Sequence, residues 1–113
     1  MKVAVVILNW NGKALLEKFL PTVMAHSQKA NIYVVDNASE DDSVQFIQEK
    51  YPKVKVIVNT TNGGFAKGYN DGLKHVDADI FCLLNSDVEV TPNWLETVTE
   101  VFKTRPEAAI VQP

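Results

Sequence analysis

The chain lacks the features that mark membrane-spanning, disulfide-bonded or nucleic-acid-binding proteins. Its 113 residues include a single cysteine, Cys82, which lies in an apolar run and gives no evidence of a disulfide framework. No run approaches the roughly 20 apolar residues of a transmembrane helix, so no membrane span is predicted in this chain. The net charge of −3 contains no basic excess, so nucleic acid is not an expected partner. A reducing compartment fits the single cysteine.

What the sequence does contain is one globular unit with a regular alternation of elements. Apolar, β-branched runs predict strands over 3–8, 32–35, 54–58 and 80–84. Apolar residues at helical spacing follow the first three runs, and Pro92 suits the first turn of a fourth helix. Short strands joined by single helices imply right-handed crossovers. The predicted fold class is therefore α/β, an open, mostly parallel sheet with helices on both faces.

Polar residues follow each predicted strand. Because the carboxyl ends of parallel strands meet at one edge, where open α/β sheets bind ligands, these residues are considered together. They are Asn9, Trp10 and Asn11; Asp36, Asn37, Ala38 and Ser39; residues 59–64; and Asn85, Ser86 and Asp87. Turns and helix caps account for some of this pattern, so the pattern alone does not prove a site.

Individual strand ends allow a structural and a functional interpretation. Ser39 and Asp42 have the spacing of a capping box, which would leave the Asp36 carboxylate spare to accept hydrogen bonds from a ribose or a pyrimidine imide. Trp10 is either a core residue or an exposed platform for a base. Asp87 is either part of a turn or a ligand of a divalent cation. The glycine pair after Asn62 matches neither a Walker loop nor GxGxxG, so it is weak evidence for a phosphate loop.

Four stretches in this order resemble the family 2 glycosyltransferases with the GT-A fold, especially their rhamnosyltransferase-like branch. The stretches are VVILNWNG, VVDNASEDDS, NTTNGGFAKGYNDG and FCLLNSDVEV, and together they cover essentially the whole chain. The resemblance implies transfer of a sugar from a UDP-, dTDP- or GDP-linked donor to a saccharide or lipid-linked acceptor hydroxyl, usually with inversion. It also suggests cell-surface polysaccharide assembly at the cytoplasmic face of the membrane.

The resemblance also assigns expected roles to residues. The nucleotide-sugar site would comprise Leu8, Asn9, Trp10, Asn11, Asp36, Asn62, Gly63, Gly64, Lys67, Asn70, Asp71, Asn85 and Ser86. Asp87 would bind Mg²⁺ or Mn²⁺ at the position of the family's DxD-type motif, with Asn85 in place of the first acid. Such a cation stabilises the charge of a leaving diphosphate.

The family's general base belongs to the second half of its domain, and none of Asp77, Asp79 or Glu89 matches it. Residues 1–113 are therefore expected to form the nucleotide-sugar-binding portion of a longer domain, inactive alone, with the base after Pro113. Three alternatives are weaker. A receiver domain would need paired acids after the first strand, a sugar nucleotidyltransferase would need a glycine-rich basic loop there, and a non-catalytic nucleotide-binding module stays open.

Overall fold

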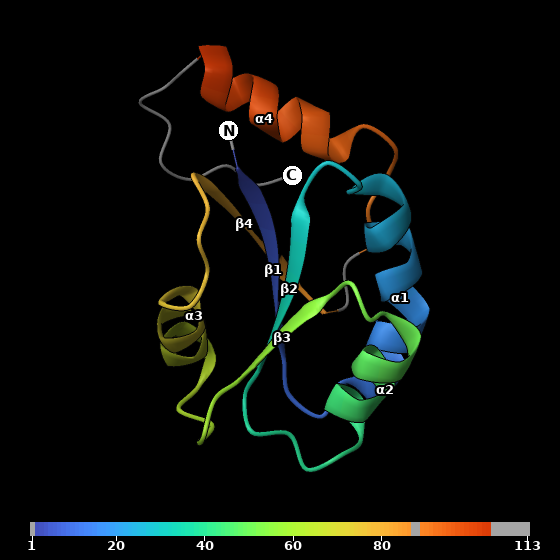
Figure 1. Ribbon diagram of the computed structural model, residues 1–113, viewed down its shortest axis with the longest axis vertical. Coiled ribbons are helices and arrows are strands. Elements are labelled where there is room, and N and C mark those ends of the chain that lie inside the picture. Colours follow the sequence, from blue (N-terminus) through green and yellow to red (C-terminus); the bar gives the residue numbers. More distant parts are fainter. Residues whose placement is uncertain (1, 87–88, 105–113) are drawn as a thin grey trace.

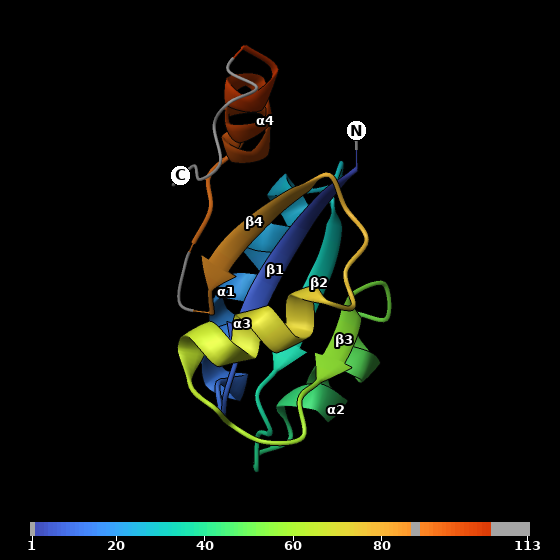
Figure 2. The ribbon, with the colours of Figure 1, turned by 90° about the vertical axis from the view of Figure 1, so that its left-hand side faces the viewer.

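The computed structural model describes residues 2–86 and 89–104, which form a parallel sheet with helices on both faces (Figures 1 and 2). The elements in chain order are β1 (Val3–Asn9), α1 (Lys13–His26), β2 (Asn31–Asp36), α2 (Ser43–Lys50), β3 (Lys55–Val58), α3 (Phe65–Leu73), β4 (Ile80–Asn85) and α4 (Trp94–Thr104). The four strands lie in the order β3-β2-β1-β4, and every neighbouring pair is parallel. The predicted fold class is confirmed.

The central strand β1 is buried on both faces, which explains its uninterrupted apolar sequence. Val3, Val5 and Ile7 share one core with α1, α2 and α4. Ala4 and Val6 point to the opposite face and share a second core with Tyr69 of α3. Figure 2 shows α3 lying across this second face, and Figure 1 shows α1 and α2 on the other side of the sheet.

Two glycines allow α3 to lie close against the sheet. A Cβ atom at Gly68 would lie 2.9 Å from Cδ1 of Leu8, and one at Gly72 would lie 2.5 Å from Cγ2 of Val35. Both distances are below normal van der Waals contact, so any larger residue would push the helix away. The Tyr69 hydroxyl, between these glycines, donates a hydrogen bond of 2.8 Å to the carbonyl of Leu84 and so links α3 to β4.

The edge strand β4 is half-covered. Ile80, Cys82 and Leu84 are buried in the α1 side of the core, whereas Phe81 and Leu83 are 41% and 47% exposed. The alternation is typical of a strand with one solvated face and differs from the doubly buried pattern of β1.

The helix boundaries differ in detail from the sequence predictions. Pro21 in the sequence predicts a kink or a division of the first helix, but it lies inside α1, which continues without division to His26. The capping box is wrong, because α2 begins after Asp42 and has no side-chain cap hydrogen bond. The fourth helix begins at Trp94, whose Nε1 donates a hydrogen bond of 2.9 Å to Oγ of the buried Ser27 and so fixes α4 to the end of α1. The sequence also favours a short extended piece at Val88 and Val90 and one more strand over 109–111. Val90 belongs to no strand, and Val88 and 109–111 lie outside the described residues.

Candidate functional site

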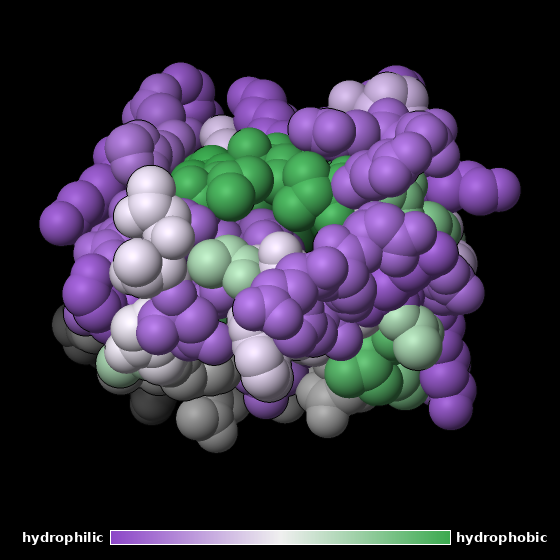
Figure 3. Space-filling model, turned by 90° about the horizontal axis from the view of Figure 1, so that it is seen from below, coloured by the Kyte–Doolittle hydropathy of each residue, from purple (hydrophilic) through white to green (hydrophobic). Residues whose placement is uncertain are grey.

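A recess of about 430 Å³ opens at the carboxyl-terminal edge of the sheet. Figure 3 shows the molecule from below, the direction in which the strands of Figure 1 point, with hydrophobic groups set among hydrophilic residues. The recess is lined by Leu8, Trp10, Leu15, Asn37, Asn62, Gly64, Asn85 and Ser86. All except Leu15 and Asn37 belong to the set predicted from the sequence. Residues at the ends of all four strands therefore converge at this recess.

None of the eight lining residues is charged. Trp10, Leu8 and Leu15 supply apolar surface, and the Trp10 side chain is 57% exposed. The amides of Asn37, Asn62 and Asn85 supply hydrogen-bond donors and acceptors. The exposed indole can stack on a flat ring, and the neighbouring amides can form hydrogen bonds with the edge of that ring.

Asp36 does not line this recess, although the sequence suggested a spare carboxylate there. The residue is 1% exposed, and its Oδ1 accepts hydrogen bonds from Nδ2 of Asn9 at 2.9 Å and from Oγ of Ser39 at 2.7 Å. Its Oδ2 accepts a third, from the Ser39 backbone N–H at 2.9 Å. The carboxylate is thus not spare, because three donors within the protein satisfy it and offset the cost of burying the charge. A contact between Asp36 and a base remains a prediction and would require exchange of one of these bonds.

Strand alternation explains why Asp36 and its neighbour differ. Successive residues of a strand point to opposite faces of the sheet. Val34 and Asp36 face α1 and α2, whereas Val35 faces α3, and Asn37 continues on that side. Asn37 therefore reaches the recess that Asp36 cannot, and the period-two pattern in the sequence was the signal that would have identified it.

Asn9 and Asn11 connect the first two βα loops. Asn9 is fully buried, as its bond to Asp36 requires. The Asn11 backbone N–H donates to Oγ of Ser39 at 2.9 Å, while its side-chain Oδ1 accepts from the backbone N–H groups of Glu40 and Asp41. Ser39 thus bonds Asp36 and Asn11 instead of capping α2. Neither asparagine is among the residues that line the recess.

The residues predicted on the third helix lie apart from the recess. Lys67 forms an ion pair of 2.5 Å with Asp71, and Lys74 lies 3.8 Å from the same carboxylate. The hydrogen bond from Lys67 lowers the pKa of Asp71. Asn70 is exposed on the same helix, and the Lys67 side chain lies against Gly63. Lys67, Asn70, Asp71 and Gly63 do not line the recess, so their contact with a donor remains a prediction.

Two of the acidic residues considered as bases, Asp77 and Asp79, lie at the wrong edge of the sheet. Asp77 and Asp79 precede β4, at the amino-terminal edge, where Asp77 pairs with Lys2 at 2.8 Å and Asp79 accepts a bond from the Lys2 backbone N–H. They are therefore separated from the recess by the length of β4.

The predicted metal ligand, Asp87, lies outside the described residues. Within residues 2–86 and 89–104, no group of three His, Cys, Asp or Glu side chains could hold a metal ion. Asn85 and Ser86, which precede Asp87, place oxygen-bearing side chains in the recess. Amide and hydroxyl oxygens are the donor type that Mg²⁺ and Mn²⁺ prefer, so this end of β4 fits such a cation in ligand chemistry.

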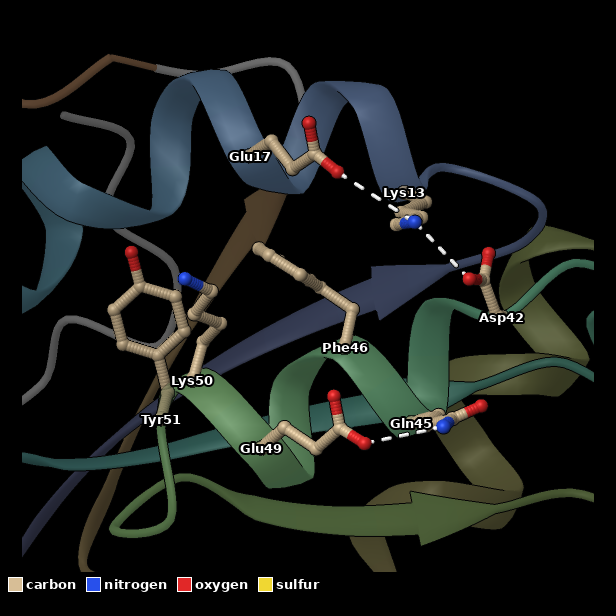
Figure 4. Close-up of a pocket in the computed structure, with 8 residues that line it drawn as sticks. All are labelled: Lys13, Glu17, Asp42, Gln45, Phe46, Glu49, Lys50 and Tyr51. Carbon is tan, nitrogen blue, oxygen red and sulfur yellow. Dashed lines mark hydrogen bonds and ion pairs between the residues drawn. The ribbon is translucent and has the colours of Figure 1, made fainter.

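A second hollow lies between α1 and α2 (Figure 4). Several of its polar groups contact one another: Lys13 lies 3.0 Å from Asp42 and 3.8 Å from Glu17, and Gln45 donates a hydrogen bond to Glu49. No residue predicted for the nucleotide-sugar site lines it. The site-like chemistry therefore belongs to the recess at the strand ends.

Comparisons with known proteins agree with this architecture. The family model "Glycosyl transferase family 2" matches residues 4–113. The chain is 31% identical to a dolichol-phosphate mannosyltransferase of Pyrococcus furiosus over 97% of this chain and 32% of that protein. It is 33% identical to a hyaluronan synthase of Streptococcus pyogenes over 89% of this chain and 26% of that protein. The chain thus spans about a third or less of the length of these relatives.

Solved structures show the same fold. Residues 1–349 of TarS from S. aureus, in complex with UDP-GlcNAc, superpose with a TM-score of 0.81 at 22% identity, over 94% of this chain and 32% of that one. The mannosyltransferase PcManGT of Pyrobaculum calidifontis, in complex with GDP-Man and Mn²⁺, gives 0.79 at 23% identity, over 89% and 32%. Among the described residues, no helix is both long and apolar enough to cross a bilayer. By its sequence match and its GT-A fold, the chain belongs to glycosyltransferase family 2.

Proposed function

We propose that this chain provides the donor-nucleotide site of a glycosyltransferase that moves a sugar from a nucleoside-diphosphate sugar to an acceptor hydroxyl with inversion. The observation that carries the proposal is the uncharged recess at the carboxyl ends of β1 and β4. It joins the exposed Trp10 ring to side-chain amides at the edge where open α/β sheets bind nucleotides. UDP-, dTDP- and GDP-sugars are the candidate donors, and the complexes of TarS and PcManGT with UDP-GlcNAc and GDP-Man support this class.

Each wall of the recess has a separate task in this proposal. Trp10, with Leu8 and Leu15, provides the apolar face for the base, and the amides of Asn62 and Asn85 bond polar atoms of the nucleotide. Asn37 replaces Asp36 as the residue of the second loop that borders the ligand. Asp36 and Asn9 hold the first two loops together from beneath.

The lining carries no cation to balance a diphosphate. Lys67, whose side chain lies against Gly63 next to Asn62, is paired with Asp71. We therefore assign Asp87 as the metal ligand. Asn85 and Ser86, which precede it in the sequence and line the recess, offer further oxygen atoms. A bound Mg²⁺ or Mn²⁺ would supply the positive charge that stabilises the leaving diphosphate. The Mn²⁺ in the PcManGT complex supports a cation of this kind.

The general base and the acceptor site belong, in this proposal, to polypeptide outside these 113 residues. The chain matches only about a third of its relatives' length, and Asp77 and Asp79 are at the opposite edge. The 113 residues alone should therefore bind a donor without transferring its sugar. The similarity to a dolichol-phosphate mannosyltransferase and a hyaluronan synthase supports a role in cell-surface polysaccharide synthesis, which we propose to occur at the cytoplasmic face of the membrane.

Titration calorimetry with UDP, dTDP and GDP, each with and without Mn²⁺, tests the proposal. We expect one of the three to bind and Mn²⁺ to tighten the binding. Trp10→Ala should weaken binding in both conditions, because stacking on an aromatic ring contributes roughly 1–3 kcal/mol. Asp87→Ala should abolish only the Mn²⁺-dependent gain, and Glu40→Ala, at an exposed loop position, serves as the control. Absence of binding by all three nucleotides with Mn²⁺ would refute the donor site.

A further inference from the structure

Three asparagines form a chain of side-chain hydrogen bonds behind one wall of the recess. Nδ2 of Asn59 donates to Oδ1 of Asn37 at 3.2 Å, and Nδ2 of Asn37 donates to Oδ1 of Asn62 at 2.8 Å. Asn37 is almost completely buried, and Asn62 is exposed at the mouth. This amide chain, defined as Asn59, Asn37 and Asn62, connects the loop after β2 with the loop after β3.

Backbone groups fix the orientation of every amide in the chain. Nδ2 of Asn59 also donates to the Gly68 carbonyl at 3.2 Å, and Nδ2 of Asn37 to the Gly64 carbonyl at 3.3 Å. A carbonyl accepts only, so nitrogen must face it in both cases. The Gly64 backbone N–H donates to Oδ1 of Asn62 at 2.9 Å, so oxygen must face that group. No asparagine can flip without losing a bond.

The fixed orientation determines which atom of the Asn62 amide is available to a ligand. Its oxygen already accepts two hydrogen bonds, from Asn37 and Gly64, whereas its nitrogen has no hydrogen-bond partner among the described residues. An amide free to rotate could offer a ligand either oxygen or nitrogen, but this one can offer only nitrogen. We infer that Asn62 is a specificity-determining donor for the nucleotide, held in that polarity by Asn37 and Asn59 as positioning residues.

The inference rests on the proposed function and defines the ligand atom that Asn62 selects, which is a hydrogen-bond acceptor. Two parts of a nucleoside diphosphate offer one: the carbonyl and hydroxyl oxygens of base and ribose, and the phosphate oxygens. A site built to donate rejects a group that also donates, because one of the two hydrogens is then left without an acceptor.

Asn62→Asp provides the sharpest test, because the carboxylate keeps the size of the amide and both oxygen contacts. It replaces only the free nitrogen by a second acceptor. We expect its urea midpoint to match that of the wild type. Its affinity for UDP, dTDP or GDP, whichever the wild type binds, should fall roughly 10-fold or more. Asn31→Asp is the matched control, since it adds the same charge at the exposed start of β2, at the opposite edge of the sheet.

Titrations with the nucleoside, the monophosphate and the diphosphate distinguish the two sources of the acceptor. A loss already present with the nucleoside would assign the bond to base or ribose, whereas a loss that begins with the monophosphate would assign it to phosphate. Side-chain amide resonances give a second readout: the Asn62 NH₂ signals should shift on nucleotide addition, and those of Asn37 should exchange slowly without ligand.

The outcomes separate the two proposals. If the wild type binds and Asn62→Asp binds equally well, the polarity inference is wrong and the donor site stands. If the wild type binds no nucleotide, both fail. Asn37→Asp should also weaken binding, because it removes the donor that holds Asn62 and the Gly64 carbonyl.

Discussion

Asn9 is a fully buried residue at the end of β1, and the oxygen atom of its side-chain amide restricts which residue can occupy position 12. Its Nδ2 bonds Asp36, while its Oδ1 has no hydrogen-bond partner among the described residues. A Cβ atom at Gly12 would lie 2.5 Å from that Oδ1. Because the bond to Asp36 holds the amide in place, Asn9 cannot move aside cheaply. Position 12 therefore requires glycine, because there is no space for a Cβ atom beside Asn9.

Gly12→Ala is therefore expected to lower the free energy of unfolding by about 1–3 kcal/mol, the usual cost of overpacking. Urea unfolding followed by circular dichroism measures it. Gly63→Ala is the matched control: its Cβ would meet Cδ of Lys67 at 2.3 Å, but that exposed, flexible side chain can swing away. Equal stability losses in the two variants would contradict the argument that a fixed neighbour decides the cost.

The residues of the candidate site were predictable to the extent that strand ends are. The recess is lined by residues that end or follow a strand at the carboxyl edge, among them Trp10, Asn62, Gly64, Asn85 and Ser86. The residue types alone could not show which of the neighbours Asp36 and Asn37 faces the recess. Ser39 was expected to cap a helix but instead bonds Asp36, because several nearby donors and acceptors compete for one hydroxyl.

At the scale of elements, periodicity was sufficient for all four strands of the sheet. The predicted runs 3–8, 32–35 and 80–84 each lie within an observed strand, and 54–58 begins one residue early. The close approach of α3 was not predicted, because glycine in a helix normally indicates weakness. Its signal was the spacing: Gly68 and Gly72 are four residues apart and lie on the same face of the helix.

Gly72→Ala tests whether this close packing outweighs helix propensity. Alanine would favour the helix by about 1 kcal/mol, yet its Cβ would lie 2.5 Å from Val35, which is fully buried in the sheet. We expect the clash to dominate and the urea midpoint to fall. Ala66→Gly, at an exposed position of the same helix, measures the propensity term alone. A Gly72→Ala protein more stable than the wild type would show that α3 can lift from the sheet at little cost.

For the molecule as a whole, ion pairs join segments that are distant in sequence. Lys2 pairs with Asp77, which links the start of the chain to the loop before β4, and Lys13 pairs with Asp42, which links α1 to the start of α2 (Figure 4). Hydrogen bonds from these lysines lower the pKa of both Asp77 and Asp42, and the same bonds raise the pKa of Lys2 and Lys13. The pairs are exposed, so each contributes little alone and less in salt.

These shifts predict how the free energy of unfolding depends on pH. A carboxylate whose pKa is lowered on folding stabilises the protein above its unfolded value, near 3.8, and this contribution disappears as the pH falls through the lower folded value. A lysine whose pKa is raised contributes below 10.5 and loses its effect as the pH rises through the folded value. Urea unfolding at a series of pH values should therefore give a plateau between these limits and a decline at each end. Asp42→Asn with Asp77→Asn should make the acid decline shallower, and added salt should flatten what remains in the wild type. If the stability of the double variant declined in acid as steeply as that of the wild type, other carboxylates would be responsible for the decline.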